Sequence, residues 1–571
     1  MDVKHVKVRG FRGIRCLDWT VNGTVIGLVG PGDSTKTTIL DAIEYALSPR
    51  WNLPISDSDF YNVQPDSPIE IEITVGDIPA ELLSEDKFGF YKRGWWRDHG
   101  ICDEPEDDCD SVLTVRLNID TDLEPSWAVV TDRHAEGKLI TSRDRARLGV
   151  VRLGVEVNRD LAWGKGSSLS RMTGPVDVDD VLAEAYRVAR ASVGETQLTK
   201  LADAAKTAAQ HAAPFGAIPA AGFAPALDPA AMSATAGALS LHDGCVPVRA
   251  AGLGTRRLVA LAIQHSVVPD GAILLIDEIE HGLEPHRIRR LIRHLRSAST
   301  GGADGQTSAS RHGQVILTTH SRVAVTELGA SEIRAVRSNG GVTTTFTPTA
   351  DLQPVLRSVP EAFLGRRVVV CEGATEVGLC WGMEDYWQDR HSGESTACRG
   401  VVFVDGGGSQ APIRAQSLAG LGYDIAYFAD SDRRVNPTVG QLSQAGVAAI
   451  CWDGGACTEG RVFSDLPWDL VQEALDLAIE EQGRESVIAS AASRLGRNAN
   501  SLSAHLDSWR DACTTEERIR AALALAAKSS NWYKRRDRAG QLAKIIIKGL
   551  PASQNTDLAS KLEQLEKWCY D

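Results

Sequence analysis

Two carboxylates directly follow an apolar run near the middle of the chain. Residues Ile273 to Ile276 read as a strand that is buried on both faces, as in a parallel sheet covered by helices. Asp277 and Glu278 come immediately after it. Carboxylates at the end of a buried strand are costly unless a cation or a reacting water lies beside them. The pattern therefore predicts that Asp277 holds the Mg²⁺ of a nucleotide and that Glu278 is a catalytic carboxylate, which orients the attacking water.

A glycine-bearing loop near the N-terminus could bind the phosphates of that nucleotide. Residues 24–29 read as a strand and residues 39–47 have the apolar spacing of a helix, which is the context that a phosphate-binding loop requires. Lys36 would reach the β and γ phosphates, and Thr37 would join Asp277 on Mg²⁺. The residue before the lysine, normally glycine, is Thr35, whose Cβ could crowd the turn. The candidate ATP-binding loop is Gly30, Pro31, Gly32, Asp33, Ser34, Thr35, Lys36, Thr37 and Thr38.

Two further segments of the first half have the character of nucleotide contacts. Gly252, Gly254 and Thr255 precede an apolar helix at residues 258–263, and glycines before a helix N-terminus favour anion binding. They could touch the γ-phosphate held by a second subunit, or they could simply cap the helix. His320 follows a buried strand at residues 315–319 and could act catalytically by sensing the γ-phosphate, although a surface histidine is the default.

Acids also follow the strands of the second half. From Arg367 the chain alternates strands and helices, which predicts a compact parallel α/β domain. Glu372 follows its first strand, and Asp430 and Asp432 follow its third. Because the carboxyl ends of parallel strands share one edge, these carboxylates would converge and would be neutralised by Mg²⁺ or Mn²⁺. Asp405, after the second strand, is an additional acid whose role the pattern does not define.

Composition limits the class of protein. A chain of 571 residues is too long for one core and predicts two domains plus an insertion. No apolar run approaches the roughly 20 residues that cross a bilayer, so we expect a cytoplasmic protein with no membrane partner. The net charge of −14 argues against a generally basic surface for nonspecific DNA binding, but a local basic groove would suffice.

The remaining segments define the domain boundaries. Residues 176–245 begin as alanine-rich helical sequence and become rich in Ala, Pro and Gly, which predicts a helical insertion serving either as a packing arm or as a dimerisation element. Residues 69–75 alternate cleanly and are expected to form an edge strand. Residues 84–174 have a weak pattern from which no function is predicted.

In their order, the motifs of the first half resemble the ABC-type ATPase heads of SMC-like proteins. The matching segments are the early Phe-Arg-Gly, the phosphate loop, the Gly-Leu-Gly-Thr segment, the Ile-Asp-Glu strand end and the histidine after the next strand. In that family the arginine after the first strand contacts nucleotide, and it would be Arg12 here. The Gly-Leu-Gly-Thr segment is a degenerate form of the signature motif of ABC-type ATPases, and the insertion is short. In both respects the chain is more similar to the OLD (overcoming lysogenization defect) family.

The second half resembles a Toprim domain, which has a glutamate after its first strand and an Asp-x-Asp motif after a later one. The resemblance implies that Glu372, Asp430 and Asp432 are catalytic metal ligands and that Glu376, the extra acid of OLD-type Toprim domains, is a further metal ligand. It also implies that Glu459 completes a second metal site and that Lys534 acts catalytically by stabilising charge on the cleaved phosphate. The alternative is that these acids are strand-end turns and that Lys534 is a surface lysine.

The combined expectation is an α/β protein with an ABC-type P-loop ATPase domain at residues 1–355, carrying a helical insertion, followed by a Toprim Rossmann-like nuclease domain at residues 360–571. The resemblance implies an ATP-binding, Mg²⁺- or Mn²⁺-dependent DNA endonuclease, active as a homodimer or larger homo-oligomer in anti-phage defence. Some family members have a helicase-like or a reverse-transcriptase (retron) partner. The alternatives are an SMC-like scaffold that clamps DNA without cutting it and, less favoured, a Toprim topoisomerase or primase.

Overall fold

The computed structural model describes most of the chain outside the alanine-rich segment. The predicted insertion at residues 176–245 lies almost wholly outside the described residues. Within the described ranges, every helix is too short or too polar to span a membrane. The described residues are 1–96, 100–154, 157–163, 167–173, 184–185, 187–188, 240–243, 246–300, 313–510 and 514–571.

One 14-stranded sheet forms the framework of the N-terminal part. Its parallel portion has the order β10, β13, β14, β3, β15, and every residue of β3, β13 and β14 is buried. The predicted strand before Asp277 is therefore present, and it is covered on both faces as its unbroken apolar run indicated. The five strands are β10 (Val150–Leu153), β13 (Ile273–Ile276), β14 (Gln314–Thr318), β3 (Val25–Val29) and β15 (Ile333–Asn339).

The rest of this sheet is mostly antiparallel. The prediction that residues 69–75 form an edge strand is wrong, because β4 (Ile69–Gly76) is hydrogen-bonded to β1 on one side and to β7 on the other. An alternation of apolar and polar residues shows that one face of a strand is buried, but it does not show how many strands pair with it. The remaining strands are β16 (Val342–Phe346), β2 (Ile14–Thr20), β1 (Asp2–Phe11), β7 (Asp110–Ile119), β5 (Arg93–Trp96), β6 (Gly100–Cys102), β8 (Pro125–Val130) and β9 (Lys138–Leu139).

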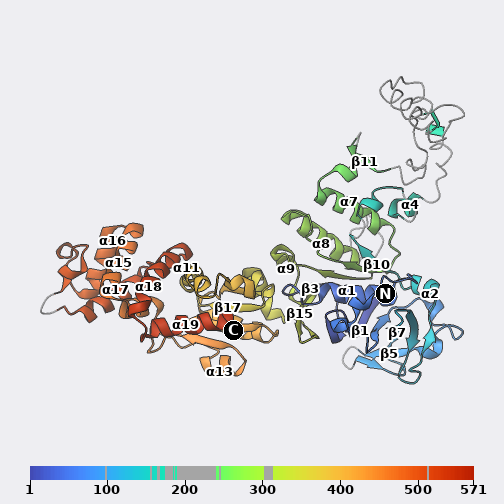
Figure 1. The fold of residues 1–571 in the computed structure, drawn as a ribbon, viewed down its shortest axis with the longest axis horizontal. Helices are drawn as coiled ribbons and strands as arrows, with labels where there is room; N and C mark the ends of the chain where they lie inside the picture. The colour runs from blue at the N-terminus through green and yellow to red at the C-terminus, as the bar shows by residue number, and fades with distance from the viewer. Residues whose placement is uncertain are drawn as a thin grey trace, which may run out of the picture.

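Helices cover both faces of the parallel portion. Helix α1 (Lys36–Leu47) shares a hydrophobic core with Ile273 and Leu275 of β13. Helix α8 (Pro285–Thr300) shares the opposite core with the alternate residues of the same strand, Leu274 and Ile276. The short helix α9 (Arg322–Glu327) and the helix α7 (Leu253–Ser266) lie on that second side (Figure 1).

A second sheet begins after residue 366. Its four strands are all parallel, in the order β18, β17, β19, β20. Helices cover both of its faces, which agrees with the α/β pattern predicted for the second half. The elements are β17 (Arg367–Cys371), α11 (Ala374–Arg390), β18 (Val401–Asp405), α12 (Ala411–Ala419), β19 (Asp424–Ala429), α13 (Val439–Gln444) and β20 (Ala448–Cys451).

The two sheets are joined by a shared core and by a stacked arginine. One hydrophobic cluster contains residues of both sheets, among them Leu274 of β13 and Val370 of β17. Arg337 of β15 lies with its guanidinium carbon 3.4 Å from the ring centroid of Tyr423, which directly precedes β19. The Tyr423 hydroxyl donates to the Phe363 carbonyl over 2.8 Å. Figure 1 shows β15 on the side of the large sheet that faces the second one.

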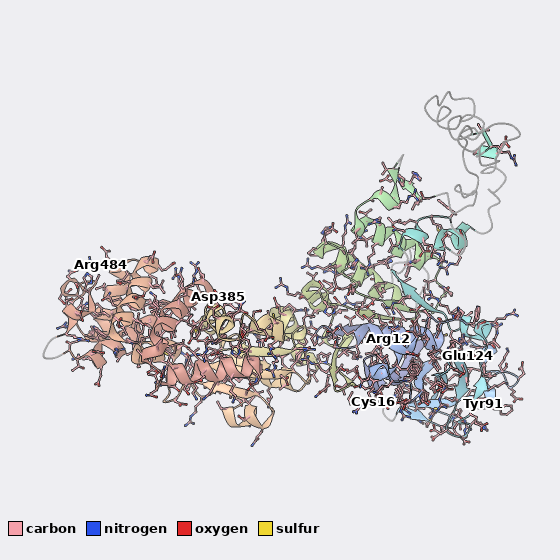
Figure 2. All side chains as sticks on the ribbon, viewed as in Figure 1. Arg12, Cys16, Tyr91, Glu124, Asp385 and Arg484 are labelled. Carbon is pink, nitrogen blue, oxygen red and sulfur yellow. The ribbon has the colours of Figure 1, made fainter. Side chains whose placement is uncertain are left out.

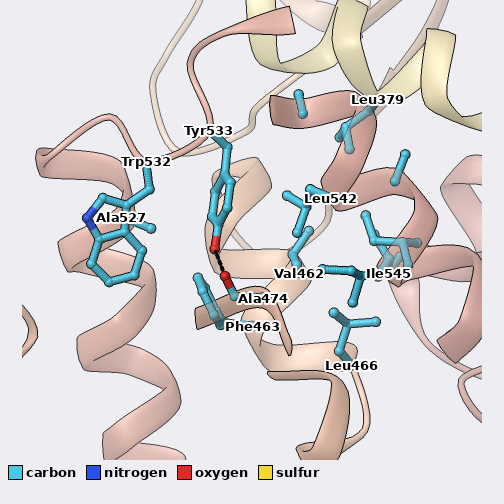
Figure 3. Packing of buried hydrophobic residues seen from close by; sticks show 14 of the residues in the cluster. Leu379, Val462, Phe463, Leu466, Ala474, Ala527, Trp532, Tyr533, Leu542 and Ile545 are labelled. Carbon is cyan, nitrogen blue, oxygen red and sulfur yellow. Dashed lines mark hydrogen bonds between the residues drawn. The ribbon is translucent and has the colours of Figure 1, made fainter. Parts of the chain in front are cut away.

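A bundle of helices follows β20 and packs on the second sheet. Trp532 and Tyr533 are fully buried in this bundle, and the Tyr533 hydroxyl donates to the Ala474 carbonyl over 2.7 Å (Figure 3). These aromatic anchors fix the position of Lys534, the next residue. The helices are α14 (Thr458–Asp465), α15 (Trp468–Gln482), α16 (Arg484–Leu495), α17 (Glu516–Ser529), α18 (Arg536–Gly549) and α19 (Asp557–Tyr570).

Candidate functional site

The phosphate loop connects β3 to α1, as its sequence indicates. Lys36 is the first residue of α1, and its ammonium donates to the carbonyls of Gly30 (3.2 Å) and Pro31 (2.6 Å) and to the hydroxyl of Ser34 (3.0 Å). Burial lowers the pKa of Lys36 to about 8. A phosphate group seated in the loop would restore the charged form and could take over these contacts. The loop backbone also passes close to β15, since a Cβ on Gly30 would lie 2.6 Å from the Val336 carbonyl oxygen.

Two residues of this loop adopt backbone conformations that favour glycine. Thr35 has φ 67° and Asp33 has φ 59°, both in the left-handed region. Left-handed φ costs an L-residue roughly 1–2 kcal/mol, and a β-branched residue such as threonine rarely adopts it. The Thr35 hydroxyl lies 3.0 Å from that of Thr343 on β16. The conformation explains why glycine normally precedes the lysine in such loops.

We expect Thr35→Gly to raise the free energy of unfolding by about 1 kcal/mol, because glycine adopts the left-handed φ of this position without strain. Urea unfolding of both proteins measures this effect. Thr35→Ala is the matched control, since it also loses the contact with Thr343 but keeps a Cβ at the same φ. Equal free energies of unfolding for the glycine and alanine variants would contradict the strain argument.

Asp277 is held among side chains from three elements. The Thr37 hydroxyl of α1 donates to its Oδ1 over 3.1 Å, and the Thr318 hydroxyl of β14 donates to the same oxygen over 2.5 Å. Arg152 of β10 donates to Oδ2 over 3.0 Å. A hydroxyl and a carboxylate beside a phosphate loop are a suitable donor set for Mg²⁺, so Thr37 and Asp277 fit the ion that accompanies a nucleotide. Arg152 is a partner of Asp277 that the sequence pattern did not indicate.

Glu278 and His320 lie at the adjacent strand ends. Glu278 has φ 45°, its backbone N–H donates to the Thr318 hydroxyl over 2.8 Å, and its carboxylate is largely exposed. The His320 backbone N–H donates to Glu280 over 2.6 Å, and Thr319 donates to the other oxygen of the same carboxylate. Burial and the nearby Lys36 charge lower the pKa of His320. Glu280, which the sequence did not single out, therefore holds the histidine-bearing turn.

Arg12 lies in the N-terminal part of the molecule (Figure 2) and is engaged by acids. Its Nε donates to Asp59 over 2.7 Å, and it also bonds Asp41 of α1. Asp41 in turn accepts from Arg152 over 3.1 Å. These contacts tie Arg12 to the helix that follows the phosphate loop. Direct contact between Arg12 and nucleotide remains a prediction.

The Gly252–Thr255 segment forms the start of α7. Gly252 precedes the first residue of the helix, and a Cβ on Gly254 would lie 2.3 Å from the Gly282 carbonyl oxygen. Thr255 accepts from Arg287 over 3.4 Å. Arg257, buried one turn later, donates to the carbonyls of Asp277 and His281 over 2.8 Å each. The segment is therefore fixed to the turn that follows Asp277, and the contact expected with a second subunit stays a prediction.

In the second half, Glu372, Glu376 and Asp430 come together at the carboxyl edge of the sheet. Glu372 Oε2 accepts from the Asp430 backbone N–H over 3.0 Å, and Asp430 Oδ1 accepts from the Thr458 backbone N–H over 2.8 Å. Burial raises the pKa of Glu372 and of Asp430, and for Glu372 the nearby Asp430 charge adds to this effect. Adjacent carboxyl groups with raised pKa values are typical of functional sites.

The Thr458 hydroxyl links two of these acids. Its oxygen lies 2.8 Å from Glu376 Oε1 and 2.8 Å from Asp430 Oδ1, and it accepts from Trp452 Nε1 over 2.8 Å. A hydroxyl has only one proton to donate, so one of the two carboxyl contacts requires a protonated acid. Glu376 is the protonated partner, because burial raises its pKa to about 8.

Glu376→Gln should remove a pH dependence of stability in metal-free protein. The folded-state pKa of about 8 lies above the ordinary glutamate value of 4.5, so folding takes up a proton between these values and the free energy of unfolding falls as pH rises through this window. The slope approaches about 1.4 kcal/mol per pH unit for one proton. Glutamine can still donate to Thr458, so its unfolding free energy should depend less on pH. Urea unfolding in chelator at pH 5 to 9 measures both proteins, and identical slopes would contradict the protonation of Glu376.

The other predicted ligands, Asp432 and Glu459, and the additional acid Asp405 lie around this cluster without joining it. Asp432 forms an ion pair with Lys528 of α17. Glu459 is buried in the first turn of α14, and the Lys534 charge partly offsets the rise in its pKa that burial causes. Asp405 caps its own turn by accepting from the Gly407 N–H over 3.0 Å.

The donor set at this edge suits a hard cation, but its geometry is incomplete. Across the described ranges, no three Asp, Glu, His or Cys side chains are arranged so that they could hold a metal ion. Carboxylate oxygens are the ligands that Mg²⁺ and Mn²⁺ prefer, and the Lys528 ammonium supplies the positive charge beside Asp432. Metal binding by Asp432 therefore requires that this ion pair opens. Lys528 lies in the last turn of an alanine-rich helix, where lysine is common, so no sequence pattern marks it as part of the site.

Comparison with known proteins identifies part of the first half. Residues 234–326, which contain α7, Asp277, Glu278 and His320, match the family described as "AAA domain, putative AbiEii toxin, Type IV TA system". Together with the phosphate loop, this match identifies a P-loop ATPase-type domain in the N-terminal part. A search of curated proteins finds no match.

Two solved structures are similar to part of this chain. One is described as "Crystal structure of the SmcHead bound to the C-winged helix domain of ScpA", with 15% identity, a TM-score of 0.34, and coverage of 61% of this chain and 97% of that chain. The other is the SMC head domain from Thermotoga maritima, with 13% identity, a TM-score of 0.29, and coverage of 61% of this chain and 99% of that chain.

Proposed function

We propose that this chain is an ATP-binding, metal-dependent DNA endonuclease of the OLD family, with an ABC/SMC-like ATPase domain at residues 1–355 and a Toprim nuclease domain at residues 360–571. The observation that carries the proposal is the meeting of Glu372, Glu376 and Asp430 at the carboxyl edge of a parallel sheet. Buried carboxyl groups that repel one another favour a divalent cation. The cytoplasmic location and the role in anti-phage defence come with the family proposal.

The acids have distinct roles in this mechanism. Glu372, Asp430 and Asp432 would hold Mg²⁺ or Mn²⁺, which supplies activated water and stabilises the leaving oxygen when bound. Glu376 and Thr458 position Asp430 through their shared hydrogen bonds. Glu459 would bind a second ion, and Lys534 would stabilise charge on the cleaved phosphate.

ATP would control this reaction through the contact between the two sheets. In this proposal, bound nucleotide closes a homodimer of ATPase domains, and slow hydrolysis resets it. The physical support is a series of contacts: Gly30 lies against the Val336 carbonyl, Arg337 stacks on Tyr423, and Tyr423 precedes β19, the strand that Asp430 follows. A rearranged phosphate loop can therefore reposition β19.

An SMC-like scaffold that clamps DNA without cutting it is the second candidate. The observation that favours it is the ion pair between Asp432 and Lys528, which neutralises the Asp432 carboxylate without a metal ion. A helicase-like or reverse-transcriptase partner would fit either function.

Incubation with supercoiled plasmid tests the proposal directly. The chain is expected to convert the plasmid to nicked or linear DNA with Mg²⁺ or Mn²⁺ and to leave it intact in chelator, with a rate that changes when ATP is added. Covalently closed relaxed DNA would indicate a topoisomerase instead. Plasmid that is bound but never cut, under every metal condition, would support the scaffold.

A further inference from the structure

Trp381 is a large aromatic side chain with no core to bury it. It is 49% exposed, although indole rings contribute most to stability when they are buried. It lies on α11, the helix that begins two residues after Glu372 and carries Glu376 in its first turn. Trp381 follows Glu376 by five positions, which corresponds to roughly 7–8 Å along the helix axis. The indole therefore lies on the same helix as Glu376.

Close helix packing fixes the position of this tryptophan. A Cβ on Gly378 would lie 2.4 Å from the Arg536 carbonyl oxygen, and a Cβ on Gly382 would lie 2.5 Å from the Gly540 carbonyl oxygen. Only glycine at these two positions lets the backbones of α11 and α18 approach so closely. Because Trp381 lies between them in sequence, its helix turn is held against the start of α18.

The surroundings of the indole are charged. The Arg536 guanidinium lies 5.3 Å from the centre of the Trp381 ring, and it also lies 3.6 Å from Asp405 at the end of β18. Asp405 marks the same sheet edge as Glu372, since β17 and β18 are paired there. Cations next to the acids or to Trp381 include Arg433, Lys528, Lys534 and Arg536.

We propose that Trp381 is a stacking site for an unpaired nucleic-acid base, so that the ligand at the acidic cluster is a strand that is single-stranded close to the cut. The inference rests on the proposed function, which supplies nucleic acid as the ligand. It adds that an unpaired base of that ligand is bound at Trp381. Single-strand binding sites combine cations that follow the phosphates with aromatic rings on which bases stack. The charged neighbours of Trp381 suit a phosphate chain better than an apolar protein surface.

The test compares single-stranded and duplex oligonucleotides. Fluorescence anisotropy with a labelled 12-nucleotide strand and its blunt duplex is measured on the full chain in Ca²⁺, with a gel to check that the DNA stays intact. Trp381→Ala should weaken binding of the single strand by about 5- to 100-fold and change duplex binding by less than about twofold, while Trp381→Phe retains single-strand binding. Trp51→Ala is the matched control, because Trp51 is 77% exposed and lies in the N-terminal part.

The outcomes separate this inference from the proposed function. Unchanged single-strand affinity in Trp381→Ala would overturn the stacking site even if the wild-type chain cuts DNA. An equal loss for single strand and duplex would also overturn it, because that pattern reports a backbone contact or a disturbed fold. Selective loss of single-strand binding in a chain that never cuts would leave the stacking site in place and remove the nuclease.

Discussion

Asp430→Asn is expected to lower the rate of metal-dependent plasmid cleavage by about a thousandfold or more while the chain stays folded. Asparagine keeps an oxygen that accepts from the Thr458 N–H and hydroxyl, so the local hydrogen bonds survive. It loses the negative charge that attracts a divalent cation, and a loss of about 4 kcal/mol of transition-state stabilisation corresponds to a thousandfold in rate. The measurement is the initial rate of nicking of supercoiled plasmid in Mg²⁺ and in Mn²⁺.

Asp424→Asn is the matched control for this experiment. Asp424 begins the same strand that Asp430 follows, so it lies at the opposite edge of the sheet, and it is largely exposed. The cleavage rate of Asp424→Asn should stay within about twofold of wild type, since Asp424 lies at the other end of the strand from the acidic cluster. Cleavage by Asp430→Asn at more than a tenth of the wild-type rate would rule out these acids as the source of the activity.

The individual strands can be predicted from the sequence because the apolar or polar character of neighbouring residues determines them. The run from Ile273 to Ile276 has no polar residue, which favours a strand covered on both faces and places the two carboxylates after it at a strand end, as the structure has them. The same reasoning predicted the strands that end near Glu372 and Asp430. Parallel pairing then brings those strand ends to one edge.

Contacts between residues that are far apart in the sequence could not be predicted in the same way. Nothing local indicates that Asp432 pairs with Lys528, because the contact forms only once α17 lies beside the turn that follows β19. The hydrogen bond between Glu376 and Thr458 joins two different helices, α11 and α14. The neighbours of β4 are equally non-local, which is why the expected edge strand is an interior one. Side-chain periodicity reports burial, whereas these features depend on topology.

Lys36→Ala is expected to weaken ATP binding by about a hundredfold or more and to abolish the response of DNA cleavage to ATP. The ammonium is the one charge inside the loop that can meet the phosphates, and each charge-assisted hydrogen bond is worth roughly 1.5–3 kcal/mol. Lys36→Met, which keeps most of the side-chain volume, should lose as much, since charge rather than packing is responsible. Calorimetric titration of ATP and plasmid cleavage with and without ATP measure the two effects.

Arg337→Met separates binding of ATP from its effect on cleavage. Methionine cannot form the stacked cation on Tyr423 or donate to the Gly365 carbonyl, but the phosphate loop keeps all its own contacts. ATP affinity should therefore stay within about twofold of wild type, and cleavage without ATP should be unchanged, while the effect of ATP on cleavage is lost. If Arg337→Met responds to ATP as wild type does, the contact between β15 and β19 does not transmit the nucleotide state. If Lys36→Ala also keeps that response, ATP acts somewhere other than the phosphate loop.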